Sequence, residues 1–283
     1  MTRRFRSAFG VNGNSVPVPP TRRQVLALGA AAAASACSGP GRDANRPAPG
    51  ATPHPAAQPP TATARPSAAG AAGSTPAPSP PVGGSATEVG HGPRTKPLVA
   101  LTFHGAGDLA TARAVLGELR RGGVHATVLA VGTWLQVEPE GARLVLDGGH
   151  ELGNHTEHHL PMRGLNAATA YAEVRTCADR LRTLMGSEGR WFRASGTQHT
   201  TPTIRRAAAR AGYATCLSYD VDSLDWTDPP SATVVSTVLR NVRAGSVVSM
   251  HLGHRTTIGA IPALLAGLRQ AGLRPVTVGE LLA

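Results

Sequence analysis

From residue 98 to the C-terminus, short apolar stretches alternate with longer stretches of helical periodicity. The apolar stretches predict buried strands at residues 98–103, 126–131, 150–153, 191–193, 213–217, 246–250 and 273–278. Helices are expected between them, at residues 109–121, 138–147, 166–185, 203–211, 231–242 and 258–271. Repeated βα units favour parallel strands with right-handed crossovers. About seven such units predict an α/β fold, a distorted barrel with its chemistry at the carboxyl ends of the strands.

Residues 1–36 are typical of an export signal. The segment Thr21-Arg22-Arg23-Gln24-Val25-Leu26 has a twin-arginine pattern and precedes a short apolar run that ends in small residues at Ala36. That run is too short to span a bilayer, as in a signal peptide. Ala34-Ser35-Ala36-Cys37 resembles a lipoprotein cleavage box, with Ala34 where leucine is usual. We expect export by the twin-arginine pathway and a lipid anchor on Cys37; the alternative is ordinary cleavage near Ala36, which releases the protein.

Residues 37–96 consist mostly of Ala, Pro, Gly, Ser and Thr, with almost no bulky apolar side chain. Such a segment cannot bury enough surface to offset the entropy lost on ordering. We therefore expect a disordered linker that holds the folded domain away from the membrane. The folded domain is expected to span residues 97–283.

The formal net charge is +11, of which five arginines belong to the expected signal, so the mature chain carries about +6. A moderate positive charge suits an anionic cell wall. Aromatic residues make up only 4% and no nucleic-acid motif is present, so we expect no nucleic-acid partner and a monomeric protein. Outside the cytoplasm Cys177 and Cys216 could pair, although two buried thiols are the simpler interpretation.

Polar side chains with catalytic potential follow the expected strands at the points where the strands end. They are His104, His155, His159, Arg193, Asp222 and His251. Because the carboxyl ends of parallel strands lie at one edge of a sheet, these residues should share one site. His155 and His159 are four residues apart, a spacing that lets two imidazoles bind one metal ion.

The folded part resembles the polysaccharide deacetylases, also called the NodB homology domain or carbohydrate esterase family four. The second motif of that family, His-Ser/Thr-x-x-His, is matched by residues 155–159. Phe192-Arg193 matches the start of the third motif, Asp222-Ser223-Leu224-Asp225-Trp226 the fourth, and residues 247–251 the fifth. The resemblance covers residue 97 to the C-terminus and implies the fold with high specificity.

The first motif departs from the family pattern Thr-Phe-Asp-Asp-Gly. Here His104 stands at the position of the general base, and Gly105 stands where the family has a metal ligand. The third motif continues as Ala194-Ser195-Gly196, without the usual proline and aromatic residue. In the fifth motif, Ser249 replaces the leucine that usually lines the acetyl pocket.

The resemblance implies a divalent metal, most commonly zinc, that polarises both a water molecule and the amide carbonyl of an N-acetylated sugar. His155 and His159 would be two ligands, and the third would be His104 or Asp108. Whichever of the two is not the ligand remains as the candidate base, and Arg193 would keep His104 neutral.

The other implied roles surround the leaving group. His251 would be the general acid, oriented by Asp222 or, failing that, by Asp225. The main-chain N–H near Gly196 would bind the oxyanion, and Trp226 would wall the acetyl pocket. Asp225 and Trp226 would also contact the substrate.

Two hypotheses follow. The first is a metal-dependent hydrolase that removes amide-linked or ester-linked acetyl groups from a cell-surface polysaccharide. The second is a deacetylase-like domain without activity that binds cell-wall glycan in the same cleft. The altered first motif favours the second hypothesis, whereas retention of His155, His159, Arg193, Asp222 and His251 favours the first.

Overall fold

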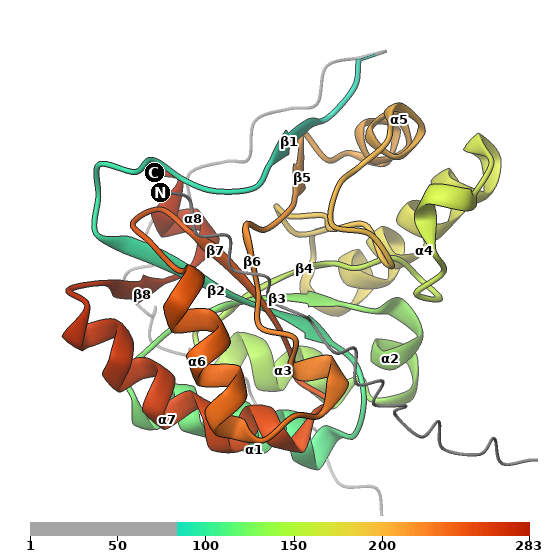
Figure 1. Cartoon of the computed structure of the whole chain (residues 1–283). Helices are drawn as coiled ribbons and strands as arrows, with labels where there is room; N and C mark the ends of the chain where they lie inside the picture. The colour runs from blue at the N-terminus through green and yellow to red at the C-terminus, as the bar shows by residue number, and fades with distance from the viewer. Residues whose placement is uncertain (1–83) are drawn as a thin grey trace, which may run out of the picture. The chain divides into compact units, whose positions relative to one another are not determined.

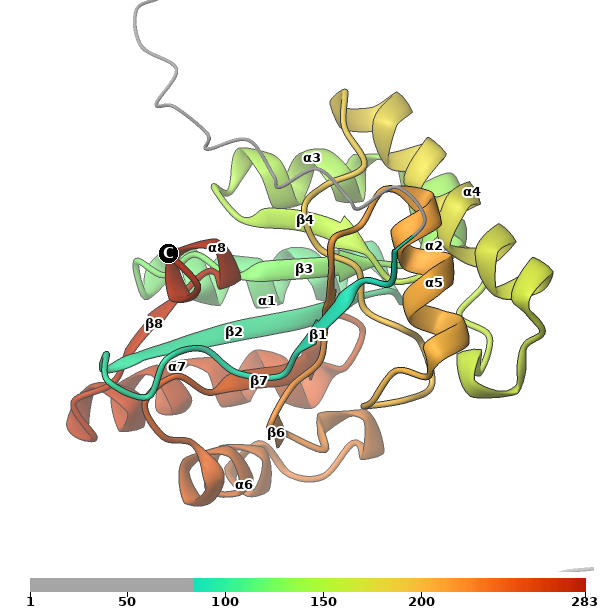
Figure 2. The same ribbon diagram turned by 90° about the horizontal axis from the view of Figure 1, so that it is seen from above.

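A computed structural model describes residues 84–283. The predicted α/β architecture is confirmed: the paired strands run parallel, and helices connect them (Figure 1). The main sheet has the order β4-β3-β2-β7-β6, and β8 pairs with the first residues of β2. Its strands are β2 (Leu98–Gly105), β3 (Thr127–Ala130), β4 (Glu151–Asn154), β6 (Val221–Asp222), β7 (Val247–His251) and β8 (Arg274–Val276). In Figure 2 the strands β4, β3, β2 and β7 lie side by side in that order.

A second, two-stranded sheet consists of β1 (Thr87–Val89) and β5 (Thr215–Leu217). Phe192 joins the two sheets, because it forms isolated parallel bridges with Asn154 at the end of β4 and with Cys216 in β5. The strand predicted at residues 191–193 is therefore reduced to a single bridging residue. A strand at this position was expected from its apolar pattern, but it is too short to form a ladder of its own.

The helices agree with the predicted ones within a few residues at most ends. They are α1 (Leu109–Arg121), α2 (Gly132–Val137), α3 (Glu140–Asp147), α4 (Ala167–Met185), α5 (Pro202–Ala211), α6 (Ser231–Asn241), α7 (Arg255–Gln270) and α8 (Val278–Leu281), with 3-10 turns η1 (Met162–Gly164) and η2 (Asp225–Thr227). Figure 1 shows α1, α6 and α7 together below the main sheet, with α4 and α5 beside β4 and β5. No helix in residues 84–283 is long and apolar enough to cross a membrane.

Alternation along the central strand β2 decides which side chains reach the site. Val99, Leu101 and Phe103 point to one face and pack in the large core with the outer helices. Ala100 points to the other face and belongs to a separate, smaller core. Since successive side chains of a strand alternate between faces, His104 follows Ala100 on the inner face.

The neighbouring strand β7 has the same alternation. Val248 and Met250 pack in the large outer core, whereas Val247 belongs to the inner one. Ser249 and His251 therefore follow Val247 on the inner face. The inner face of β7 therefore carries apolar Val247 first and then the polar side chains of Ser249 and His251, which line the cavity described below.

The expected boundary between linker and folded domain at residues 96 and 97 is wrong. Thr87–Val89 forms β1, and the Glu88 carboxylate binds the loop before α5, accepting hydrogen bonds from Thr200. Farther along, Arg94 forms an ion pair with Asp220, with 2.7 Å between Nη2 and Oδ2. Composition misplaced this boundary because a three-residue strand needs few apolar side chains when its partner strand supplies the ladder. The predicted signal (1–36) and most of the predicted linker (37–83) lie outside the described residues.

Candidate active site

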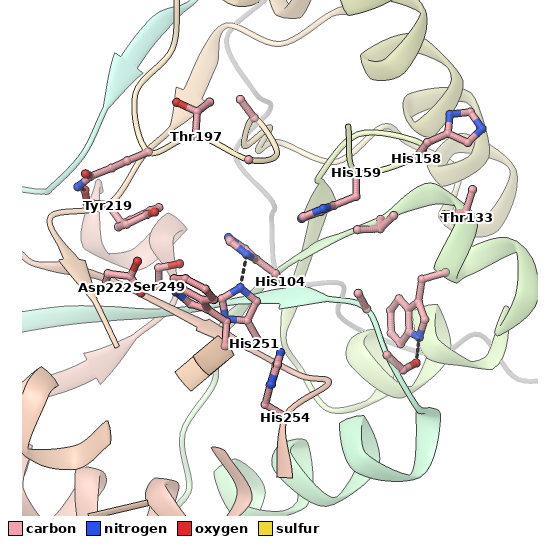
Figure 3. Close-up of a pocket in the computed structure, with 18 of the residues that line it drawn as sticks. His104, Thr133, His158, His159, Thr197, Tyr219, Asp222, Ser249, His251 and His254 are labelled. Atoms are coloured by element: carbon pink, nitrogen blue, oxygen red, sulfur yellow. Dashed lines mark hydrogen bonds between the residues drawn. The ribbon is translucent and has the colours of Figure 1, made fainter. Parts of the chain in front are cut away.

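A cavity of about 1040 Å³ opens at the carboxyl ends of the inner strands. Its walls carry His104 and His251 from the main sheet, together with side chains from the loops that follow β3, β4 and β6. Figure 3 shows His104 and His251 facing each other, with His159 on one side and Asp222 and Ser249 on the other. Of the polar residues chosen from the sequence, four line this cavity: His104, His159, Asp222 and His251.

His104 and His251 are directly opposite residues on the paired strands β2 and β7. Their rings meet edge to face, and His104 Nδ1 lies 2.9 Å from His251 Nε2 (Figure 3). The other nitrogen of His104, Nε2, lies 3.2 Å from Arg193 Nη1. Both ring nitrogens of His104 therefore have partners within the protein.

Asp225, and not Asp222, orients His251. The Asp225 side chain is fully buried, and its Oδ1 lies 2.7 Å from His251 Nδ1. Its Oδ2 accepts hydrogen bonds from the main-chain N–H of His251 and from the Thr257 hydroxyl. Burial acts to raise the pKa of Asp225, but these hydrogen bonds hold it below the ordinary value. The carboxylate thus stays ionised and keeps a proton on His251 Nδ1.

Asp222 has a different surrounding. Its Oδ1 accepts a hydrogen bond from the Leu224 N–H, and its side chain lines the cavity. Leu224 adopts a left-handed conformation with φ of 57°, which turns the chain so that the buried position falls to Asp225. The carboxylate that contacts His251 is therefore Asp225, the alternative in the sequence assignment, and not Asp222, which was preferred there.

The hydrogen bonds around His104 determine the proton positions. A guanidinium only donates, so His104 Nε2 must accept from Arg193 and its Nδ1 must carry the proton. His104 Nδ1–H then donates to His251 Nε2, while His251 Nδ1–H donates to Asp225. The result is one continuous chain from Arg193 through the two imidazoles to Asp225. Burial, with the neighbouring His155, holds the pKa of His104 well below its usual range, which agrees with a neutral ring.

Arg193 is a buried cation whose hydrogen-bond partners are neutral. Its guanidinium donates to the carbonyls of Leu217 and Ser218 in addition to His104, and it lies 5.2 Å from the ring centroid of Tyr219. Among the described residues it forms no ion pair. Burial lowers the pKa of Arg193 to about 10, so it remains charged at neutral pH.

His155 lies beneath His104, with the two rings stacked at 4.1 Å between centroids. Its Nδ1 donates to the main-chain carbonyl of Arg193 at 3.0 Å, which leaves Nε2 as a bare acceptor. That Nε2 is fully buried and has no hydrogen-bond partner among residues 84–283. Burial, together with His159, holds the pKa of His155 well below its usual range. Histidines that bind a metal through Nε2 are usually neutral and are usually held by a hydrogen bond from Nδ1–H to a carbonyl or carboxylate.

The residues present do not, however, complete a three-ligand metal site. The ring centroid of His159 lies 4.9 Å from that of His155, so these two side chains could share an ion. His104 is not free to be the third ligand, because both of its ring nitrogens already have hydrogen-bond partners. Asp108 caps α1 by accepting hydrogen bonds from Thr111, so its assignment as ligand or base is wrong. Within residues 84–283, no three His, Cys, Asp or Glu side chains are grouped so that they could hold a metal ion.

Gly105 offers no ligand and little room for one. A β carbon at this position would lie 3.0 Å from Val128 Cγ1, 3.1 Å from Ala130 Cα and 3.1 Å from Trp134 Cζ3. Trp134 is held there by a hydrogen bond from its indole nitrogen to the carbonyl of Gly107. The indole thus occupies the space beside the position where the family has an aspartate.

Two buried glutamates hold the His155–His159 loop in an unusual backbone conformation. Thr156 and His159 have positive φ angles of 69° and 58°. Glu157 pairs with Arg180 of α4, and Glu173 of α4 accepts hydrogen bonds from the main-chain N–H and the ring of His158. Strained backbone is retained where the surroundings over-determine it, so these contacts keep His159 at the cavity.

Other expected residues also lie at the cavity. Gly196 has a φ of 64°, and Trp226, which also lines the cavity, is 52% exposed. Sequence reasoning assigned no role to several further lining residues: Trp134, Val137, His158, Thr197, Gln198, Tyr219 and His254. In the sequence, these residues lie shortly after predicted strands, and that position could have identified them as cavity residues.

Comparison with known proteins gives one consistent family. The family model for polysaccharide deacetylase matches residues 91–216. A peptidoglycan-N-acetylglucosamine deacetylase of Bacillus cereus is 31% identical over 194 residues, which is 67% of this chain and 90% of that protein. The peptidoglycan-N-acetylmuramic acid deacetylase PdaC of Bacillus subtilis is 26% identical over 65% of this chain but only 38% of that protein.

Solved structures show the same fold. A family 4 carbohydrate esterase from Streptomyces lividans in complex with acetate has a TM-score of 0.58 and 29% identity, covering 63% of this chain and 91% of that one. A pseudoenzyme of the same family from Bacillus anthracis has a TM-score of 0.66 and 24% identity, with 70% of both chains covered.

Proposed function

Because the chain belongs to the polysaccharide deacetylase family, we propose that it hydrolyses the N-acetyl groups of a cell-wall glycan. The observation that carries this proposal is the Asp225–His251 pair at the cavity. Asp225 is fully buried and accepts three hydrogen bonds, two of them from His251 itself. Burying a carboxylate is costly, and a domain that only binds glycan has no evident need to orient a histidine in this way.

Hydrolysis of an amide requires an activated water, a stabilised oxyanion and a proton for the leaving amine. His251 can supply the first and the third in turn, because its Nε2 faces the cavity while Asp225 holds the proton on Nδ1. Gly196 is an exposed residue of the cavity wall, and its main-chain N–H is the candidate oxyanion donor. His251 Nε2 must first give up its hydrogen bond with His104, whose Nδ1–H is then available to the substrate.

A divalent metal supplies Lewis acidity in relatives of this kind. Here the His155 and His159 nitrogens suit such an ion, but the described part of the chain supplies no third ligand, so we assign no step to a metal. We therefore keep the predicted function as a deacetylase of cell-wall glycan and do not include the predicted metal dependence in the proposal.

The proposed substrate also sets the place of action. The named substrates of both Bacillus relatives are peptidoglycan sugars. We therefore propose that this protein works outside the cytoplasm, in keeping with the twin-arginine pattern and lipoprotein box of its sequence. The exposed Trp226 on one side of the cavity offers a flat apolar wall to a sugar ring.

The test is acetate release from peptidoglycan and from N-acetylglucosamine oligomers. Asp225→Asn should lower the rate by about 10²-fold or more, since an oriented acid or base contributes about 10²–10⁴-fold. Asp222→Asn should lose less activity, and Asp179→Asn, on the outer face of α4, is the matched control. Equal rates for Asp225→Asn and the wild type would contradict the assignment.

A second function, binding of the glycan without hydrolysis, is favoured by Gly105 and by the His104–His251 hydrogen bond. Gly105 has no side chain to bind a metal. The hydrogen bond from His104 occupies His251 Nε2, the atom that would transfer a proton during hydrolysis. The same substrates distinguish the two functions. Retention of the protein on peptidoglycan with no acetate release by the wild type would establish this second function.

A further inference from the structure

Ser249 places a hydroxyl in the wall of the cavity, beside His251. It precedes His251 by two residues on β7, so both side chains point to the same face, about 7 Å apart along the strand. Ser249 is 1% exposed and lines the cavity. Its Oγ forms no hydrogen bond with any residue in the described range 84–283. Ser249 Oγ is not among the buried polar atoms without a partner, so this hydroxyl is open to the cavity and can hydrogen-bond a group bound there.

Asp222 lies beside Ser249. The two residues are register partners on β6 and β7, so their side chains leave the sheet on the same face, about 5 Å apart. Asp222 Oδ1 accepts the Leu224 N–H, and Oδ2 forms no hydrogen bond within the described chain. Figure 3 shows Asp222, Ser249 and Tyr219 grouped on one side of His251. This wall of the cavity therefore offers a hydroxyl and a carboxylate oxygen.

These groups do not suit a plain acetyl group. A methyl placed against Ser249 and Asp222 would remove water from both without replacing its hydrogen bonds, which costs free energy for each group left unpaired. An acyl group with a hydroxyl on the carbon next to its carbonyl can donate to Asp222 and accept from Ser249. The carbonyl would remain within reach of His251, two residues farther along β7.

We propose that the cavity selects a 2-hydroxyacyl amide, of which N-hydroxyacetyl is the smallest, on the amino sugar of the glycan. The inference rests on the proposed function for its reaction but makes a separate claim about specificity. In that reaction the bond between the carbonyl carbon and nitrogen breaks. The oxygen of water goes to the carbonyl carbon as a hydroxyl, and a proton goes to nitrogen. The products are a free amino sugar and 2-hydroxyacetate.

The experiment compares two oligosaccharides that differ by one oxygen atom: N-acetylglucosamine and N-hydroxyacetylglucosamine oligomers of equal length. Binding is measured by calorimetry, and release of acetate or hydroxyacetate is measured by chromatography. The wild type should favour the hydroxyacetyl oligomer by about tenfold or more, because a site built to hydrogen-bond a hydroxyl rejects the analogue that lacks it.

Ser249→Ala removes the hydroxyl with little change in size and should reduce the preference to near unity. Ser249→Leu should reverse it in favour of acetyl, provided that its melting temperature shows a folded protein. Ser236→Ala, at a partly exposed position on α6 outside the cavity lining, is the matched control and should keep the wild-type preference.

The outcomes separate the inference from the proposed function. Equal binding and release of the two oligomers, or a preference for acetyl, would overturn the inference and leave the deacetylase function standing. Preferential binding of the hydroxyacetyl oligomer without release of either product would support the inference and refute hydrolysis. Failure to bind either oligomer would overturn both.

Discussion

At the residue scale, two substitutions in one motif alter the roles of their neighbours. His104 takes the position of an acid, and its hydrogen bonds draw Arg193 and His251 into one chain. Arg193 then has a neutral imidazole as partner where the family has a carboxylate. Gly105, next in sequence, lets Trp134 approach the backbone. The departures therefore affect both the charge and the packing of the site.

The packing at Gly105 leads to a stability prediction. Gly105→Ala should lower the free energy of unfolding by about 1–3 kcal/mol, because the added methyl meets Val128, Ala130 and Trp134 at 3.0–3.1 Å in a closed core. Gly164→Ala is the control, since nothing lies within 4 Å of its β carbon. Chemical denaturation measures both. Unchanged stability for Gly105→Ala would mean that the indole gives way easily and that a ligand could be accommodated.

A second prediction at this scale concerns pH. Burial, with His125 as a neighbour, lowers the pKa of His150 from its ordinary 6.5 to about 4. Between these values the unfolded chain binds a proton that the folded chain does not, so the free energy of unfolding falls as pH falls through this window. His150 Nδ1 accepts the Ala126 N–H, a bond that the amide oxygen of asparagine can replace.

His150→Asn should therefore reduce the loss of melting temperature between pH 6.5 and 4 relative to the wild type. His104 and His155 also have lowered pKa values, so a part of the wild-type loss should remain in the variant. Parallel curves of melting temperature against pH for the two proteins would refute the assignment to His150.

At the element scale, β1 couples the start of the described chain to one wall of the cavity. Glu88 binds Thr200 and His199, and the loop that they follow contributes Gly196, Thr197 and Gln198 to the cavity. Gln198 is also held from the other side, where its carbonyl accepts the Ser218 hydroxyl. A strand of three residues thus supports a loop that contacts substrate in the proposed function.

Removal of β1 should destabilise the domain. A chain that starts at residue 94 should melt at a lower temperature than one that starts at residue 84, by about 2–4 °C for each kcal/mol lost. Glu88→Gln in the longer chain is the narrower change and should speed amide hydrogen exchange at residues 196–200 without altering that of α1. Equal melting temperatures for the two chains would show that β1 contributes nothing.

At the scale of the whole molecule, the sequence predicts a domain exported and held at the membrane surface. Replacing Arg22 and Arg23 by Lys should leave the protein in the cytoplasm, because twin-arginine transport depends on the pair itself. Cell fractionation and immunoblotting measure this. Unchanged export of the double Lys variant would indicate another pathway.

A separate experiment tests the lipid anchor: Cys37→Ser should shift the exported protein from the membrane to the soluble fraction.

Much of the fold could be predicted because its signals are local. Apolar stretches and helical periodicity located β2, β3, β7 and nearly every longer helix, since burial of one face imposes a repeat on the sequence itself. The exceptions, β1 and the bridging Phe192, are too short to carry a repeat. They form because a neighbouring strand supplies their hydrogen bonds.

The sequence by itself determined the kind of fold, the shared edge for the polar residues, and the likeness to a family. Only the tertiary structure decided the partners: Asp225 instead of Asp222 for His251, a helix cap for Asp108, and two filled nitrogens for His104. The physical reason is that a side chain's partner depends on direction and distance through space. A residue in the left-handed conformation, such as Leu224, changes the direction and the distance at which the next side chains lie, and so does a neighbouring strand. Neither produces a periodic pattern in the sequence.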